Sequence, residues 1–395
     1  MKKGILTYLL LLSAGLLQAA LPGVKIEAGP YLQAVTETGF TVVWASDTDA
    51  VAWVEVAPDD GSDFYAAERP RYYHSEHGKR IIGRLHRVPV TGLEPGTRYR
   101  YRYRIFTQGI LENGGNKGVI PGRIAASRVY KHEPYYATTL NPDKKTISFA
   151  VVNDIHGNDS LFRQLLGGVT EKNTDFVVLN GDMTSMIESE RQLFDGYLRS
   201  ASELFAANVP FCFVRGNHEN RGAFSYRASD YFPTPTGRFY YTFRHGPAFF
   251  VVLDCGEDKP DNDIEYSGLA DFDRYRETEA DWLKGVVASE EFRQAPLRIV
   301  LLHIPPLHYD WHGGREIQRL FMPLLQGAGV DLMLCGHLHK AFYTAAGEDK
   351  YDFPVLINSN RECVRVTIEG RKIEAEIRDA AGKTVARHTV RGGRE

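Results

Sequence analysis

Five short apolar segments of the chain each end in side chains that can bind metal ions. Asp154 and His156 lie two residues apart, as do His337 and His339 at the last of these ends. Residues two apart in an extended segment point the same way, so each pair could place two ligands together. The other three segments end in Asp182, in Asn217 followed by His218, and in His303. One such aspartate is commonly a turn residue, but five such ends in one chain predict a metal site.

The ligand types favour divalent transition metals. Carboxylate, amide and imidazole groups suit Zn, Mn or Fe, and no thiolate is needed. Cys335 lies next to the last histidine pair, but the segment before it is apolar. We therefore expect Cys335 to pack. Because the four cysteines are scattered and lack CxxC spacing, we expect buried free thiols, although a secreted protein allows a disulfide.

Residues 145–391 alternate strand-like apolar runs with amphipathic helical segments. The helical patterns span residues 188–209, 278–292 and 316–328, between runs such as DFVVLNGD and LRIVLLHIPP. This alternation predicts an α/β domain with a layered sheet. Ligands bind such sheets at the carboxyl ends of the strands, which places the five polar ends on one rim.

Residues 24–140 are predicted to be all-β and to precede this domain. Tyr99, Tyr101 and Tyr103 alternate with arginines from 98 to 104, so the two kinds of side chain occupy opposite faces of a strand. The arginine face is either a binding surface for an acidic ligand or a solvated strand face. The glycine-rich residues 107–128 predict a long loop. The leucine-x-proline-glycine turn before the tyrosines resembles fibronectin type III-like sandwiches, in which Tyr99 would be the corner tyrosine.

The ordered blocks DIHG, GDM, GNHE, a single histidine and GHLH resemble the calcineurin-like metallophosphoesterases. The β-region before these blocks further resembles the purple acid phosphatase branch of that family. This resemblance implies two divalent metal ions. It assigns Asp154, His156 and His339 to the first ion, Asn217, His303 and His337 to the second, and Asp182 to both.

The same resemblance implies a reaction. A hydroxide that bridges the two ions would attack a phosphoryl group, and His218 would protonate the leaving oxygen or bind the phosphoryl group. His218 and Asp154 are therefore the candidate catalytic residues. Purple acid phosphatases have glycine where this chain has His156, and an iron-binding tyrosine where it has Ser185. Since that tyrosine causes the purple colour, we expect a colourless centre.

Candidate substrate contacts are Arg221, His308, Tyr309 and His312. Arg221 could bind a phosphate oxygen or form a structural ion pair, and the other three could be ordinary surface-loop residues. The acidic segment 256–276 is expected to wall the site and to disfavour highly anionic substrates.

These observations predict a two-metal phosphoric ester hydrolase that acts on a phosphorylated small molecule, with monoesters favoured. The alternatives are a phosphodiesterase or nucleotide hydrolase on the same centre, or a non-enzymatic glycan-binding surface protein with a scaffold metal site. The net charge of −3 at pH 7 provides no basic field for a nucleic acid. The oligomeric state does not follow from the sequence.

Residues 1–20 are predicted to be a secretory signal peptide. Lys2 and Lys3 precede an apolar run, residues 5–17, that is short for a membrane span, and Ala19 and Ala20 supply a cleavage site. No later run is long enough to span a membrane. We expect a secreted bacterial protein, periplasmic or extracellular, without a transmembrane segment in the mature chain.

Overall fold

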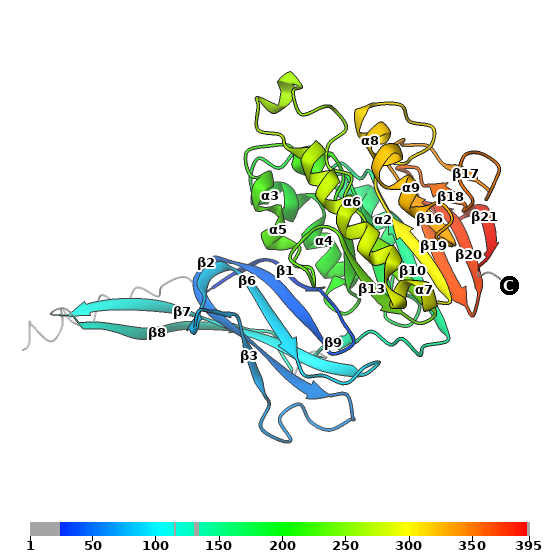
Figure 1. Cartoon of the computed structure of the whole chain (residues 1–395). Helices are drawn as coiled ribbons and strands as arrows, with labels where there is room; N and C mark the ends of the chain where they lie inside the picture. The colour runs from blue at the N-terminus through cyan, green and yellow to red at the C-terminus, as the bar shows by residue number, and fades with distance from the viewer. Residues whose placement is uncertain (1–23, 114–115, 130–133, 393–395) are drawn as a thin grey trace, which may run out of the picture.

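The computed structural model describes residues 24–113, 116–129 and 134–392. The predicted signal peptide, residues 1–20, lies outside the described residues. A strand-rich N-terminal part lies against a larger part in which helices flank strands (Figure 1), which confirms an all-β region followed by a layered α/β domain. β9 ends at Thr138 and β10 begins at Thr146, and we propose the domain boundary between them.

Two six-stranded sheets form the centre of the larger part. The strand order is β12-β11-β10-β19-β20-β21 in the first sheet and β13-β14-β15-β16-β18-β17 in the second. Neighbours among β10, β11 and β12 are parallel, and so are those along β14, β15, β16 and β18. These strands are largely apolar because both of their faces are covered. The bounds are β10 (Thr146–Val152), β11 (Phe176–Asn180), β12 (Phe211–Val214), β13 (Tyr241–His245), β14 (Ala248–Val252), β15 (Leu297–Leu301), β16 (Leu332–Cys335), β17 (Phe342–Thr344), β18 (Val355–Ile357), β19 (Glu362–Glu369), β20 (Lys372–Asp379) and β21 (Thr384–Arg391).

The two sheets face each other across one apolar core. Phe149 of β10 meets Phe250 of β14 edge to face, with ring centroids 5.6 Å apart. Val178 of β11 and Leu301 of β15 belong to the same buried cluster. Because protein cores are closely packed, this contact holds the strand ends of both sheets in fixed relative positions.

Helices cover the outer face of each sheet and complete four layers (Figure 1). The predicted helix 188–209 is helical from Glu190 to Ala206, but two of its turns, η1 and η2, are π-helical. No helix in the described part of the chain is long and apolar enough to cross a membrane. The bounds are α2 (Asp159–Leu166), α3 (Glu190–Leu193), η1 (Phe194–Leu198), α4 (Arg199–Ala201), η2 (Ser202–Ala206), η3 (His218–Asn220), η4 (Ser225–Arg227), α5 (Ala228–Tyr231), η5 (Ile264–Tyr266), α6 (Phe272–Ala288), α7 (Glu290–Gln294), α8 (His312–Leu320) and α9 (Met322–Leu325).

The N-terminal part is a seven-stranded sheet built around the long strand β2, with a separate β4-β5 pair. The hydroxyl of Tyr99 accepts a hydrogen bond of 3.0 Å from the backbone N–H of Glu94. This is the kind of contact that a corner tyrosine makes, but the fibronectin-like character of the region stays a prediction. The bounds are β1 (Ile26–Gln33), β2 (Gly39–Pro58), β3 (Arg71–Tyr73), β4 (Ser75–Glu76), β5 (Lys79–Arg80), β6 (Ile82–Thr91), β7 (Arg98–Asn113), β8 (Asn116–Ala126) and β9 (Tyr135–Thr138).

The segment predicted as a loop, residues 107–128, instead forms most of a long hairpin. β7 and β8 pair in register from Arg104 opposite Ala126 to Asn113 opposite Asn116. The hairpin extends away from the rest of the molecule (Figure 1). Its glycines weaken strand propensity, but the continuous cross-strand ladder outweighs that local effect.

The arginine face of β7 is engaged within the chain. Arg98 pairs with Glu171 at 2.6 Å, and Arg104 pairs with the buried Glu55 at 3.5 Å. The remaining two donate to oxygen atoms, Arg100 to the carbonyl of Pro58 (2.7 Å) and Arg102 to the hydroxyl of Tyr65 (2.8 Å). All four arginines therefore make contacts within the chain, and a role of this face in binding an acidic ligand stays a prediction.

Buried hydrogen bonds fasten the N-terminal sheet to the larger part. The hydroxyl of Tyr31 donates to the carbonyl of Tyr231 (2.9 Å), and the hydroxyl of Tyr101 donates to the carbonyl of Ala207 (2.6 Å). Tyr31 also belongs to the apolar cluster that includes Phe162 of α2. The two parts therefore share one core at their interface.

All four cysteines are free and buried, as predicted. Burial raises the pKa of the Cys335 and Cys363 thiols above their usual range. A thiol held in its neutral form is a poor metal ligand, which agrees with the packing role expected for Cys335.

Candidate metal centre

The five predicted strand ends meet at one rim between the two sheets. Asp154 and His156 follow β10, and Asp182 follows β11. Asn217 and His218 follow β12, also in the first sheet, whereas His303 follows β15 and the pair His337 and His339 follows β16 in the second. Since the two sheets pack face to face, loops from both reach the same space.

The loops that carry these side chains have unusual backbone conformations. Of the nine described non-glycine residues with positive φ, five are predicted ligands: Asp154, His156, Asp182, His337 and His339. Such conformations cost about 1–3 kcal/mol each and concentrate at functional sites. The neighbouring glycines are also required, because a Cβ at Gly181 would overlap the His303 ring and one at Gly216 would overlap the Asp182 carboxylate.

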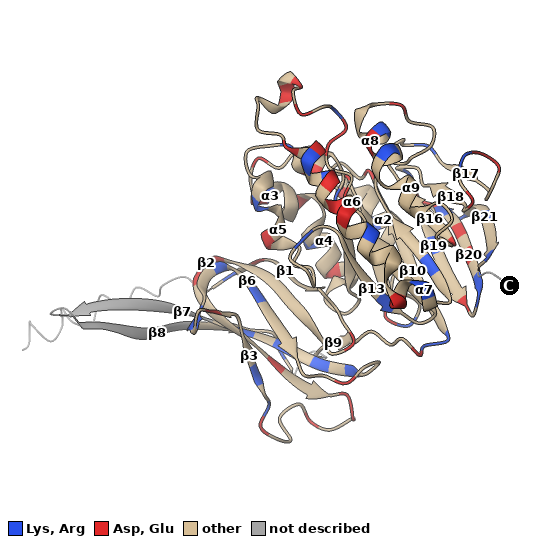
Figure 2. Cartoon of the chain, in the orientation of Figure 1, with Lys and Arg blue, Asp and Glu red and all other residues tan. Residues whose placement is uncertain are grey.

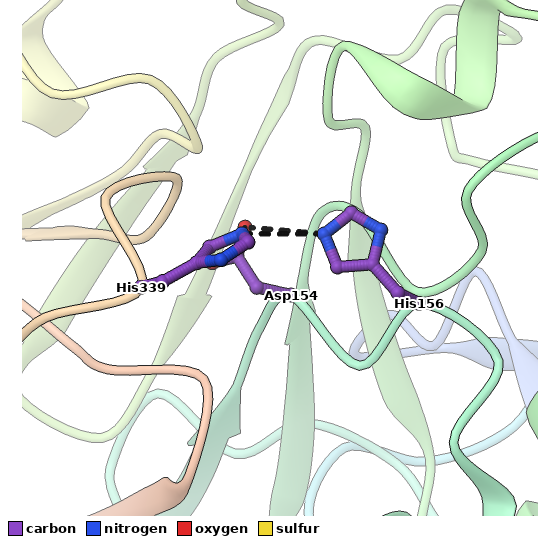
Figure 3. Close-up of side chains that lie close together, drawn as sticks. All are labelled: Asp154, His156 and His339. Carbon is purple, nitrogen blue, oxygen red and sulfur yellow. Dashed lines mark hydrogen bonds and ion pairs between the residues drawn. The ribbon is translucent and has the colours of Figure 1, made fainter.

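One cluster consists of Asp154, His156 and His339 (Figure 3). His339 Nε2 lies 3.2 Å from Asp154 Oδ1 and 3.3 Å from His156 Nε2. His156 Nε2 lies 4.0 Å from the same carboxylate oxygen. Three potential donor atoms therefore face one point, an arrangement that suits a bound cation.

A second cluster joins Asp182, His303 and His337. The Nδ1–H of His303 donates to the carbonyl of Asn180 at 2.7 Å, so a neutral His303 presents the lone pair of Nε2. That nitrogen lies 3.2 Å from Asp182 Oδ2, where two acceptors would repel each other without a proton or a cation between them. Asp182 also belongs to a third group, with His156 and His218, and so connects the clusters.

Three buried ligand atoms in this region have no hydrogen-bond partner among the described residues. They are Asp154 Oδ1, Asn217 Oδ1 and His303 Nε2. Leaving a buried polar atom unpaired costs about 1–3 kcal/mol. Each of these atoms has a lone pair that can bind a cation, and each lies in one of the two clusters or beside them. The residues therefore fit divalent metal ions.

The charge balance of the two clusters depends on His303. Burial alone lowers the pKa of His303, but the carboxylates of Asp182 and Asp154 outweigh burial and raise it to about 10. Burial and the neighbouring His303 charge lower the pKa of His337 to about 4. Burial would raise the pKa of Asp182, but the His303 charge dominates and lowers it. Without a metal ion, a proton on His303 therefore supplies the positive charge that balances these carboxylates.

Comparison with known proteins agrees with this geometry. Residues 147–341 match the family model of the calcineurin-like phosphoesterases. These residues are a calcineurin-like phosphoesterase domain. The phosphoesterase domain contains every strand end that the sequence analysis singled out.

Two plant proteins are similar over a longer stretch. The chain is 25% identical to purple acid phosphatase 21 of Arabidopsis thaliana over 274 residues, which cover 65% of this chain and 52% of that protein. It is 23% identical to purple acid phosphatase 18 of the same plant over 317 residues, 75% of this chain and 62% of the relative. The chain thus spans between half and two thirds of the length of these relatives.

The fold is also shared with a solved structure. Purple acid phosphatase PPD1 from yellow lupin (Lupinus luteus) superposes with a TM-score of 0.62 at 15% sequence identity. The superposition covers 91% of this chain and 73% of the lupin chain. The likeness therefore includes both the phosphoesterase domain and strands that precede it.

Glu219 connects two ligand loops of the phosphoesterase domain and was assigned no role from the sequence. Its fully buried carboxylate accepts hydrogen bonds from the backbone N–H groups of Asp182 (2.9 Å), Met183 (2.7 Å) and Gly216 (2.9 Å). Burial and the nearby Asp182 charge raise the pKa of Glu219 to about 7. The GNHE block contains this residue, but the backbone groups that donate to its carboxylate become visible only in the fold.

Asn153 orients the Asp154 carboxylate. The side chain of Asn153 donates to Asp154 Oδ2 at 2.6 Å, and the backbone N–H of His337 donates to the same oxygen at 2.8 Å. Asn358 in turn donates to Asn153 Oδ1 at 2.8 Å. These contacts leave Asp154 Oδ1 turned toward His339. In the sequence, the position of Asn153 directly after a strand is the one feature that indicates such a role.

Ser185 contacts two histidines of the phosphoesterase domain. Its Oγ lies 3.1 Å from His156 Nδ1, and its carbonyl accepts a hydrogen bond of 2.8 Å from His218 Nδ1–H. In the sequence, Ser185 stands out only as the residue that replaces a tyrosine. The structure shows that this serine lies beside His156, the position at which purple acid phosphatases have glycine.

His218 and Arg221 lie side by side at the edge of the clusters. The backbone N–H of His218 donates to Asp182 Oδ1 at 2.9 Å, and His218 Nε2 lies 3.9 Å from Asp182 Oδ2. Arg221 forms ion pairs with Glu257 (2.9 Å) and Asp258 (3.0 Å), and its Nη1 lies 3.3 Å from His218 Nε2. Of the two roles expected for Arg221, the structure shows the ion pair.

The other three predicted substrate contacts lie in different surroundings. The ring of Tyr309 meets that of His337 edge on, at a centroid distance of 4.4 Å. His308 stacks on Phe342 at 4.7 Å, and His312 lies 2.6 Å from Asp273 of α6. Only Tyr309 among these three touches a cluster residue, and a substrate role for all three stays a prediction.

Proposed function

We propose that the phosphoesterase domain hydrolyses phosphoric esters with two divalent metal ions and prefers monoesters of small molecules. The observation that carries this proposal is the convergence of aspartate and histidine donor atoms in two clusters, together with the buried Asn217 Oδ1, which has no hydrogen-bond partner among the described residues. When bound, the ions would supply positive charge to the phosphoryl oxygens and lower the pKa of a water molecule. The first ion would be held by Asp154, His156 and His339, the second by Asn217, His303 and His337, with Asp182 shared by both.

His218 is the proposed general acid. Its Nδ1 must carry a hydrogen because it donates to the Ser185 carbonyl, so Nε2 is the atom that can hand a proton to a leaving oxygen. Imidazole suits this task near neutral pH.

A rate panel tests the proposed activity. Purified chain is stripped with a chelator, supplied with Zn, Mn or Fe, and given p-nitrophenyl phosphate, bis-p-nitrophenyl phosphate and a nucleotide set. We expect metal-dependent hydrolysis, fastest for the monoester. If no ester is hydrolysed with any of the metals, the proposal of a hydrolase is wrong, and the non-enzymatic glycan-binding protein becomes the favoured alternative.

His218→Gln separates catalysis from metal binding. We expect kcat to fall about 10²–10⁴-fold, the usual contribution of a general acid or base, while the metal content stays unchanged. The loss should be smaller for esters with acidic leaving groups, since these need less protonation. Equal losses for all leaving groups would reject the general-acid role.

The metals are proposed to be divalent and the loaded protein colourless. This rests on Ser185, which replaces the iron-binding tyrosine of purple acid phosphatases. A visible absorption band in the loaded protein would contradict the proposal.

We also propose that the chain is exported. The proposal rests on the charge, apolar run and small residues of segment 1–20. Mass spectrometry of the chain recovered from the periplasm or medium should show cleavage after Ala20, and an uncleaved chain in the cytoplasm would contradict it.

A further inference from the structure

A large cavity opens beside His218. Its volume is about 880 Å³, and its lining includes Ser185, His218 and Arg221. These three residues also contact each other at the edge of the metal clusters. The cavity is therefore continuous with the proposed active site and begins at the proposed general acid.

Apolar side chains stand around this cavity with unusual exposure. Its lining includes Met186, Tyr226, Tyr266, Leu269 and Phe272. Leu269 is 89% exposed, Tyr226 76% and Met186 46%. Large apolar side chains gathered at the opening of a pocket are typical of ligand sites.

The charged side chains of the lining are already paired. Arg215 forms an ion pair of 2.6 Å with Asp254, and Arg221 pairs with Glu257 and Asp258. Glu265 pairs with Lys259 at 2.8 Å. A second phosphate or carboxylate on a bound ligand would therefore lose water without gaining an unpaired cation from the described lining.

We propose that this cavity receives the leaving group of the ester and selects an uncharged aromatic or other apolar group. The inference rests on the proposed function. Hydrolysis breaks the bond between phosphorus and the leaving oxygen, forms a bond from phosphorus to a water oxygen, and places one proton on the leaving oxygen. Because the cavity begins at His218, the proposed proton donor, the leaving group would lie on the cavity side of the site.

The acidic segment 256–276, which was expected to border the site, forms part of the cavity lining. Glu265, Tyr266, Ser267, Leu269, Ala270 and Phe272 line the cavity. The acidic residues of this loop have structural tasks, since Asp261 accepts hydrogen bonds from the N–H groups of Phe272 and Asp273 at the start of α6. Selection against anions therefore arises from the paired and apolar lining rather than from free carboxylates.

The test compares two esters in three forms of the full chain. The substrates are 2-naphthyl phosphate and glycerol 2-phosphate, and the proteins are the unmodified chain, Tyr226→Ala/Leu269→Ala and Ile264→Ala. Ile264 is 91% exposed on the same loop but lies outside the cavity lining, so it is the matched control. The ratio of the two rates is compared among the three proteins. The two esters differ in leaving-group acidity by the same amount in each protein, so this difference cancels.

We expect the double variant to lower the naphthyl-to-glycerol ratio of kcat/KM on the order of tenfold, chiefly through a higher KM for the naphthyl ester. Ile264→Ala should keep the ratio of the unmodified chain. An unchanged ratio in the double variant, or the same fall in Ile264→Ala, would overturn the inference.

Binding of 2-naphthol, followed by its fluorescence, separates this inference from the proposed function. A chain that hydrolyses neither ester but binds 2-naphthol, with weaker binding in the double variant, would reject the phosphoesterase proposal and support the apolar cavity. A chain that hydrolyses both esters but binds 2-naphthol equally well in all three forms would reject the cavity alone.

Discussion

At Asp154 and Asp182, the two oxygens of each carboxylate have different partners. Asp154 Oδ2 and Asp182 Oδ1 accept backbone hydrogen bonds from His337 and His218. The other oxygen of each carboxylate faces histidine nitrogens. The backbone therefore fixes the orientation of both ligands before any ion binds, which lowers the cost of ordering them.

Ser185→Ala should weaken binding of the first ion. The substitution removes the hydroxyl beside His156 Nδ1 but keeps the carbonyl that holds His218. Loss of such an outer contact commonly costs 10–100-fold in metal affinity. Affinity is measured by competition with a chelator. Ser185→Thr, which retains a hydroxyl, should restore most of the affinity, and equal affinities in all three proteins would reject the role.

Metal binding should release protons and strengthen as pH rises. Metal-free His303 is protonated up to a pKa of about 10, and the ion takes the place of that proton. Below this pH the proton competes with the metal, so apparent affinity rises from pH 6 to pH 9. Calorimetry in buffers of different ionisation enthalpy counts the protons. Binding without proton release at pH 7 would contradict the assignment of His303.

At the scale of elements, Glu219 ties the loop after β11 to the loop after β12. Its carboxylate accepts from one loop at Asp182 and Met183 and from the other at Gly216. Both loops carry ligands in strained backbone conformations or beside glycines that cannot be replaced. The connection holds the loops at the separation that the two clusters require.

Glu219→Gln should lower the free energy of unfolding by about 1–3 kcal/mol, because a side-chain NH₂ would face backbone N–H donors. Urea denaturation of the metal-free protein measures the change. Glu203→Gln is the control, since Glu203 forms an exposed ion pair with Arg163 and such pairs contribute little. Equal stability of the Glu219 variant and the control would show that the connection is unimportant.

The strand ends could be predicted because the apolar runs before Asp154, Asp182 and His303 are local features of the sequence. The β7–β8 hairpin could not, because its glycines favour a loop locally and only pairing with a distant partner overrides them. The roles of Glu219 and Asn153 were missed for the same reason. Their partners come from other segments, and no local pattern identifies a contact of that kind.

For the whole molecule, the N-terminal sheet supports the layer of helices behind the first ligand strands. Tyr31 and Tyr101 donate to carbonyls at the end of α5 and directly after η2. Gln33 donates to the carbonyl of Phe211 at the start of β12 (2.9 Å). Asn217 and His218 follow that strand. Acidic and basic residues alternate along the coloured parts of the ribbon (Figure 2), which agrees with the small net charge.

Tyr101→Phe should destabilise the contact between the two parts. It leaves the buried carbonyl of Ala207 without its donor, a loss of about 1–3 kcal/mol. Hydrogen exchange should speed up along β12 and the helical segment before it. Tyr99→Phe is the control, because the Tyr99 hydroxyl accepts its hydrogen bond from the N–H of Glu94, within the N-terminal part. Unchanged exchange in the Tyr101 variant would show that the interface does not brace β12.

The metal content of the purified chain tests the central claim most directly. After loading with Zn or Mn and exhaustive dialysis, elemental analysis should find two ions per chain. Asn217→Ala should retain one firmly bound ion, because its amide belongs to the second set of ligands only. One ion or none in the unmodified chain, or two firmly bound ions in the variant, would contradict a two-metal centre built from these strand ends.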